Sequence, residues 1–307
     1  MSSLNVATRH DVRSNDMLGP KSTEASFMAA ELKWFLETQT PPIISEIETI
    51  IETKVRYGKA RPGFGWEQDL ILSETNLTGF QDVRTNSPST LAVTSSSSDL
   101  VKGFITIDGT AIVKGELTLK LPHYNRGNAV KVTINSAQPP HLDQLRAAQY
   151  YLTLALQAFE KYPISTRDQA GLSKLLDRIA TATRKAQKTL SRYKEKNGFP
   201  SKECDVKSFS PDLPEDLVIE FFVLQSTLMV SVRALNYPQQ GIPLQIQSKI
   251  LGKFRNVKLE TYRGRPVEVL DEIIVGSPSP RLATLIRSLN TIGGLCEDMQ
   301  NKLRMFK

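Results

Sequence analysis

Three stretches of the chain repeat apolar residues at alternating steps of three and four positions. This spacing is typical of a helix that buries one face. The repeats occupy residues 142–159, 172–193 and 282–306. Tyr162 and Pro163 lie between the first two repeats, so we predict that a turn joins these two helices into an antiparallel hairpin.

Local signals mark the start of one of these helices and an unusual position in another. Ser165 or Thr166 is the expected N-cap of the second helix, because a hydroxyl side chain there accepts a hydrogen bond from an otherwise unpaired backbone N–H. Gly293 and Gly294 fall inside the third repeat, although glycine weakens a helix. We expect a close contact with a neighbouring helix to be the reason for this pair.

A further helical pattern, in residues 23–51, contains two adjacent prolines. Pro41 and Pro42 cannot donate backbone hydrogen bonds. They therefore predict a kink or a break, with a second helical piece that begins at about Pro41, where proline is tolerated. Residues 1–21 are polar and show no periodicity, which predicts a flexible tail.

Between the helical stretches, apolar and polar residues alternate over short runs, as in strands that bury one face. Two pairs of runs flank short turns and predict β-hairpins, at residues 217–224 with 228–235 and at residues 257–262 with 267–275. A run of four serines at residues 95–98 predicts a loop. Further strands are expected at residues 69–73, 89–93, 104–107, 116–121 and 131–134.

The helical and strand-like stretches alternate along the chain, and like elements usually pack together. We therefore predict an α+β fold with two domains, each discontinuous in sequence. One is an antiparallel bundle of about four helices, from residues 22–57, 139–197 and 278–307; the other is an antiparallel β-sheet domain, from residues 58–138 and 198–277. The length of 307 residues agrees with this division, because a single core stops growing at about 250–300 residues.

The helical repeats also resemble leucine zippers, in which a helix pairs with a helix of a second chain. Short repeats separated by turns are what a bundle needs in order to bury its own apolar faces. We therefore favour packing within one chain, and we expect the protein to be monomeric on its own.

The chain has 39 Lys and Arg against 32 Asp and Glu, a net charge of +7. Much of the surplus lies on the helix predicted at residues 166–196, where the basic residues form one stripe opposite the apolar repeat. Such a stripe is either a solvated face or a binding surface for an acidic partner, a phosphate or an anionic membrane. Aromatic residues do not alternate with these bases, so we expect no nucleic-acid partner. The candidate partner-binding residues of this basic stripe are Arg167, Lys174, Arg178, Lys185, Lys188 and Arg192.

Residues that could carry catalysis or bind a metal are few. Cys204 and Cys296 are far apart and form no Cys-x-x-Cys pair, which argues against a disulfide framework and a structural zinc site. His10, His123 and His141 fit neither a zinc-binding helix motif nor a catalytic triad. We therefore expect no metal, no cofactor and no enzymatic activity. Neither a secretory signal nor an apolar run of roughly 20 residues is apparent, so we expect a cytoplasmic protein.

Several stretches, taken in order, resemble the Rogdi family of eukaryotic proteins. None of them is a catalytic motif, so the resemblance depends on their order and spacing from about Ala29 onward. It implies an α domain and a β domain, as in the organisation predicted above. The matching stretches are residues 31–36 (ELKWFL), 101–109 (VKGFITIDG), 119–122 (LKLP), the helix at 142–159, and 213–218 (LPEDLV).

The resemblance also implies a function. Proteins that this chain resembles act as the small accessory subunit of the RAVE-type assembly factor, which contains a large β-propeller subunit. That factor promotes reassembly of the vacuolar proton-pumping ATPase on vacuolar and endosomal membranes. We therefore expect a non-enzymatic adaptor that binds the large RAVE-type subunit and ATPase subunits and associates peripherally with these membranes. The alternatives are a module that binds anionic membranes through the basic stripe, a general interaction scaffold, and a hydrolase with an unfamiliar site.

Overall fold

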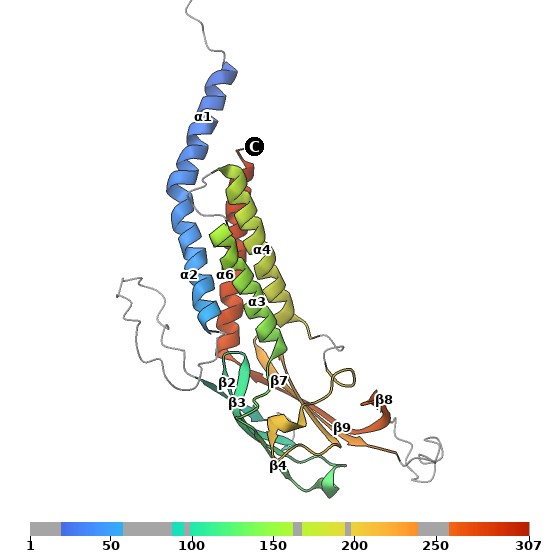
Figure 1. The fold of residues 1–307 in the computed structure, drawn as a ribbon. Coiled ribbons are helices and arrows are strands. Elements are labelled where there is room, and N and C mark those ends of the chain that lie inside the picture. The colour runs from blue at the N-terminus through green and yellow to red at the C-terminus, as the bar shows by residue number, and fades with distance from the viewer. Residues whose placement is uncertain are drawn as a thin grey trace, which may run out of the picture.

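The computed structural model describes residues 20–57, 88–94, 99–161, 168–193, 198–238 and 258–306. Its helices lie side by side in an elongated bundle, and its strands gather at one end of that bundle (Figure 1). The helices and strands of the described residues confirm the α+β fold class. The helical elements are α1 (Pro20–Trp34), the π-helix η1 (Phe35–Gln39), α2 (Thr40–Tyr57), α3 (Asp143–Lys161), α4 (Gln169–Ser191) and α6 (Pro280–Arg304).

Helices α2, α3, α4 and α6 form the bundle. Helix α3 contacts α2 and α4, and α6 contacts the same two helices from the other side. Successive helices run in opposite directions, so the bundle is antiparallel (Figure 1). The apolar repeats line its interior, and the leucine-zipper-like positions are therefore buried within one chain. Buried repeat residues include Leu145, Leu152, Leu176, Ile179, Leu190, Leu289, Ile292 and Leu303.

The two adjacent prolines do not break the N-terminal helix. A π-helical segment, η1, precedes them, and α2 begins at Thr40, immediately before the Pro41 expected from the sequence. The backbone N–H of Thr40 donates to the carbonyl of Phe35, and the Thr40 hydroxyl donates to the same oxygen at 3.1 Å. The wider turn thus accommodates two residues that have no N–H to donate, and the helix remains continuous.

The strands form two antiparallel sheets, where the sequence predicts one sheet domain. Their orders are β1-β2-β3-β4-β5 and β6-β7-β9-β8. The two predicted hairpins, β6 with β7 and β8 with β9, are both present, and β2 and β3, also expected as strands, pair antiparallel as well. The strands are β1 (Ser89–Thr94), β2 (Val101–Asp108), β3 (Ala111–Leu119), β4 (Val130–Ile134), β5 (Phe209–Ser210), β6 (Leu217–Leu224), β7 (Thr227–Asn236), β8 (Lys258–Tyr262) and β9 (Arg265–Pro278).

One glycine in the first sheet is required by the close approach of two strands. Gly103 of β2 lies opposite Leu117 of β3, at a φ of 155°. A Cβ atom at this position would lie 1.9 Å from the carbonyl oxygen of Glu116. Every other residue type would therefore push the two strands apart.

Hydrogen bonds fix the bundle to the second sheet. The side chain of Gln144 on α3 pairs with the backbone of Val223 on β6: its Nε2 donates to the carbonyl, and its Oε1 accepts from the N–H, both at 2.6 Å. The N–H of Gln225 donates to the carbonyl of Leu190 at 2.7 Å. One hydrophobic core runs through the bundle and both sheets. The division into two domains therefore stays a prediction.

Several expected boundaries are wrong by a few residues. Helix α1 begins at Pro20, so the predicted tail ends before residue 20, since proline fits the first turn of a helix. Helix α4 begins at Gln169, and its N-cap is Asp168, whose carboxylate accepts from the N–H of Gly171 at 2.7 Å. Strand β9 continues through Pro278, where the sequence predicts the start of the last bundle segment. Residues 1–19 and the turn, loop and strand predicted at residues 162–163, 95–98 and 69–73 lie outside the described residues.

The expected reason for the glycine pair in α6 is also wrong. A Cβ atom added at Gly293 or at Gly294 would meet no atom within 4 Å apart from the surrounding helix. No close helix contact therefore requires these glycines.

Candidate functional site

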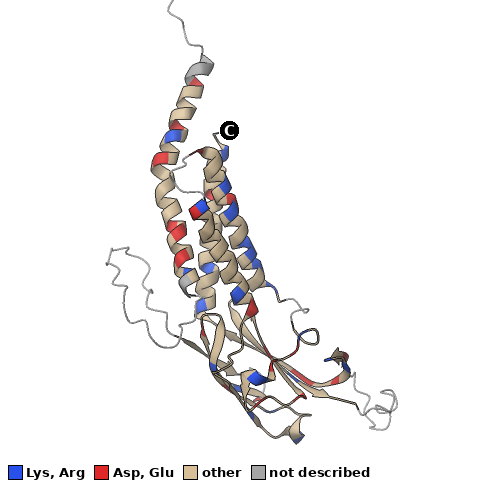
Figure 2. Ribbon diagram, in the orientation of Figure 1, with Lys and Arg blue, Asp and Glu red and all other residues tan. Residues whose placement is uncertain are grey.

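The basic stripe is exposed along one side of α4. Arg167 lies outside the described residues, whereas the other five members of the stripe lie on the solvent side of the helix, away from the buried apolar repeat. From Lys174 to Arg192 the stripe extends about 27 Å, at 1.5 Å per residue. Figure 2 shows basic residues along α4, whereas acidic residues predominate on α2, diagonally across the bundle.

Residues of α3 extend this surface, and the sequence pattern does not reveal them. The ammonium group of Lys185 lies 5.8 Å from the centre of the Tyr151 ring. The Tyr151 and Tyr150 rings lie 5.6 Å apart, and Tyr150 is 60% exposed. Leu154, one turn further along α3, is 39% exposed. We call the surface formed by Lys174, Arg178, Lys185, Lys188, Arg192, Tyr150, Tyr151 and Leu154 the α3–α4 face.

The opposite edge of α4 faces α6. Asp177 accepts a hydrogen bond from Gln300 at 2.6 Å, and Gln187 donates one to Asn290 at 2.9 Å. Asp177, the one acidic residue of α4, is exposed beside the basic stripe, and its carboxylate is held by Gln300. The face therefore joins a row of positive charges to a small apolar and aromatic area.

His123 and the two cysteines are held in place by neighbouring residues or buried, whereas His10 lies outside the described residues. The Nδ1 atom of His123 lies 2.6 Å from Asp271 of β9, and its backbone N–H donates to the same carboxylate at 2.8 Å. Burial raises the pKa of the Cys296 thiol to about 12, and it also raises the pKa of Cys204. High pKa values disfavour the reactive thiolate. Among the residues that the structure describes, no group of three or more His, Cys, Asp or Glu could hold a metal ion.

Comparison with known proteins gives the family of the chain. The sequence profile described as "Rogdi leucine zipper containing protein" matches residues 31–256. The chain belongs to the Rogdi family. It is 20% identical over 304 residues to "Protein rogdi homolog" of Danio rerio, which covers 94% of this chain and 97% of that protein. The homologue of the same name from Homo sapiens is 20% identical over 233 residues, which covers 72% of this chain and 71% of that protein.

These comparisons confirm the resemblance to the Rogdi family that the sequence indicates. The profile match contains α3 and α4, and therefore the whole α3–α4 face of this Rogdi chain. None of the helices in the described ranges is long and apolar enough to cross a membrane.

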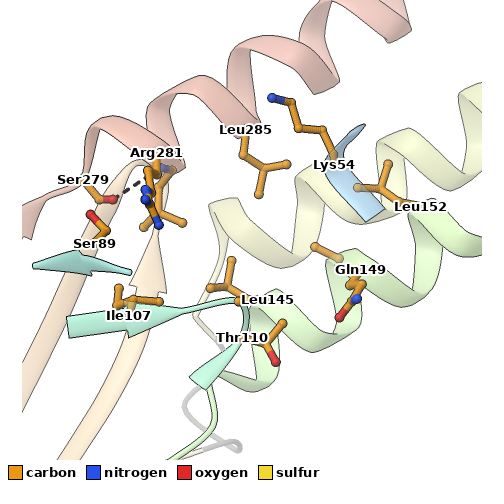
Figure 3. A pocket seen from close by; sticks show the side chains of 13 residues that line it. Lys54, Ser89, Ile107, Thr110, Leu145, Gln149, Leu152, Ser279, Arg281 and Leu285 are labelled. Carbon is orange, nitrogen blue, oxygen red and sulfur yellow. Dashed lines mark hydrogen bonds between the residues drawn. The ribbon is translucent and has the colours of Figure 1, made fainter. Parts of the chain in front are cut away.

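The Rogdi chain also has a small pocket where the bundle meets the sheets (Figure 3). Lys54 of α2 and Arg281 of α6 approach it from either side of Leu285, and Leu145 of α3 and Ile107 of β2 form its apolar floor. Its volume of about 40 Å³ holds about three water molecules. Partial burial lowers the pKa of Lys54. Lys54 and Arg281 are the charged residues among the described residues that line the pocket, and its volume is much smaller than that of a pocket for a cofactor or a drug-sized ligand.

The N-terminal helix of the Rogdi chain exposes large apolar side chains. Phe27, Met28 and Trp34 on α1 are all exposed. In Figure 1 this helix projects beyond the end of the bundle, and residues 24–31 are all exposed. Isolated helices of this length are marginal in water.

Proposed function

We propose that this Rogdi-family chain is a non-enzymatic adaptor, the small accessory subunit of a RAVE-type complex that promotes assembly and reassembly of the vacuolar proton-pumping ATPase. Family membership, shown by the profile match over residues 31–256, is the observation that carries the proposal. Its partners in this role are a large β-propeller-containing subunit and subunits of the ATPase. It acts in the cytoplasm, at the surface of vacuolar and endosomal membranes.

The geometry supports an adaptor role. The bundle and the sheets lie at opposite ends of an elongated molecule (Figure 1). Hydrogen bonds from Gln144 and Gln225 join the two parts without a flexible connection at that point. We propose that the bundle and the sheet region serve as two binding units held in a fixed relative orientation, which is what an adaptor needs to position two partners.

Affinity capture of the tagged chain at its native expression level tests the proposal. We expect to recover a large β-propeller protein and subunits of the vacuolar ATPase, and we expect cells without the chain to acidify their vacuoles poorly. Recovery of neither the propeller protein nor any ATPase subunit would refute the adaptor function. A parallel measurement of the mass of the purified chain tests the prediction that it is monomeric.

A second candidate function, direct binding to anionic membranes, is favoured by the exposed basic stripe on α4. Each Lys or Arg near an anionic bilayer contributes about 1 kcal/mol, and this attraction is screened by salt. Flotation with vesicles containing phosphatidylserine tests it. Binding that depends on neither the anionic lipid nor the salt concentration would eliminate this function.

A further inference from the structure

We propose that the α3–α4 face is the docking site for an acidic, amphipathic helix of a protein partner. The proposal deepens the adaptor function and rests on it, because the partner is then the large subunit or an ATPase subunit.

The positive charge of the face indicates that one side of the partner helix is acidic. Its basic residues recur along α4, and the one carboxylate of that helix, Asp177, accepts a hydrogen bond from Gln300 of α6. Within the described residues, Lys174, Lys185 and Lys188 form no ion pair with an Asp or Glu. Cations without carboxylate partners favour a surface rich in Asp and Glu.

The apolar part of the face indicates that the partner helix also has an apolar side. Tyr150 and Leu154 are one helical turn apart on α3, and both are exposed. Tyr151 links them to the basic stripe, since its ring lies against both Tyr150 and Lys185. A partner that satisfies the bases and also covers this area must present acidic and apolar residues side by side, as an amphipathic helix does.

The dimensions of the face fit one helix. The basic stripe is about 27 Å long, which equals about 18 residues of a partner helix. Toward α6, the surface of α4 continues through the exposed Arg184, and Asp177 and Gln187 are hydrogen-bonded to that helix. A membrane-binding surface buries a broad apolar area with Trp, Phe or Leu. The exposed apolar residues of this face are instead confined to one edge, which favours a protein helix as the occupant.

Site-specific photo-crosslinking in the full-length chain tests the docking site. Thr181 is exposed on α4 between the bases, and a photoreactive p-benzoylphenylalanine there should crosslink to the occupant in cells. Mass spectrometry of the crosslinked peptide should identify a segment rich in Asp and Glu with apolar residues three and four positions apart. The same photoreactive residue at Thr291, exposed on α6, is the matched control and should not crosslink to that segment.

Charge reversal supplies the second part of the test. Lys185→Glu combined with Lys188→Glu should reduce the Thr181 crosslink at least about tenfold, because it places like charges against the acidic helix. Arg287→Glu combined with Lys302→Glu changes the net charge equally on the exposed side of α6 and should leave the crosslink unchanged.

Three results would overturn the docking site: a crosslink only to phospholipid, a crosslink to a segment without acidic residues, or no crosslink at all. Equal crosslinking at Thr181 in both charge-reversed variants would also overturn the docking site. Affinity capture from the same cells separates the two proposals. If the propeller subunit is recovered while Thr181 fails to crosslink, the adaptor function stands and the docking site is wrong.

Discussion

Replacement of Arg233 should destabilise the second sheet strongly, because this residue neutralises a carboxylate that is almost buried. Arg233 of β7 is 11% exposed, and its Nη1 lies 2.6 Å from Glu220 of β6, which is 13% exposed. It also binds Glu272 of β9 at 2.8 Å and lies over the ring of Phe199, 5.0 Å from its centre. The three strands and the segment that contains Phe199 are thus joined through one guanidinium group.

The expected loss in the free energy of unfolding follows from the Glu220 charge that Arg233→Leu leaves buried without its partner. Removal of one member of a buried ion pair costs about 3–5 kcal/mol, because the remaining charge is buried without its partner. Glu220 retains the backbone N–H of Phe199, which donates to it at 2.7 Å. We therefore expect a loss near the lower limit, about 3 kcal/mol in the free energy of unfolding. Urea unfolding at pH 7, followed by circular dichroism, measures it.

Two further variants make this prediction specific. Replacing both Arg233 and Glu220 by Leu removes the unpaired charge and should give a protein clearly more stable than Arg233→Leu, within about 2 kcal/mol of the wild type, because the N–H of Phe199 then lacks its acceptor. Lys202 forms an ion pair with Asp143 at the same 2.6 Å distance, but its side chain is 53% exposed, so Lys202→Leu should cost less than about 1 kcal/mol. The reasoning is refuted if Arg233→Leu costs no more than Lys202→Leu, or if the double variant is as unstable as the single one.

Three other predictions concern the bundle and the thiols. Gly293→Ala and Gly294→Ala should each raise the free energy of unfolding by about 0.5–1 kcal/mol, because alanine favours a helix interior and its Cβ meets nothing there; a loss in urea unfolding would reveal a contact. Burial lowers the pKa of Lys54, so the native state at pH 7 carries the cost of a half-buried charge. Lys54→Met should then raise the free energy of unfolding by about 0.5 kcal/mol after solvent screening. This gain should shrink as the pH rises toward the unfolded-state pKa of about 10.4, because the native lysine loses its proton first. A gain that stays constant to pH 10 in urea unfolding would contradict this. Burial raises the pKa of Cys296 to about 12 and raises that of Cys204, so iodoacetamide at pH 8 should modify neither thiol until urea unfolds the chain, which mass spectrometry can follow.

The local spacing of apolar and polar residues was sufficient to predict most helices and strands of the fold. The apolar repeats that end in Phe159, Tyr193 and Phe306 lie on α3, α4 and α6, because a spacing of three and four residues places one side of a helix toward a core. Alternation likewise located the paired strands β6 and β7 to within one residue at each end. The basic stripe on α4 could be read in the same way, since it depends on the period of a single helix.

Features that depend on distant parts of the chain could not be read from the sequence. The α3–α4 face needs Tyr150 and Leu154, which belong to a different helix from the basic stripe and show no charge pattern of their own. The pocket at Lys54 combines residues of α2, α3, α6 and the first sheet. The π-helical turn before Pro41 begins at the buried Phe35, and the centre of its ring lies 5.8 Å from that of Phe306, a residue distant in sequence.

By itself, the sequence determined the helices, the hairpins, the family and the side of α4 that carries positive charge, because each depends on spacing within one segment or on the order of segments. Tertiary structure alone decided that the strands divide into two sheets, that one core continues through bundle and sheets, and that tyrosines of α3 lie beside the bases of α4. The physical reason is that periodicity specifies which face of an element is buried but not which other element covers it. That choice follows from side-chain packing across the whole chain.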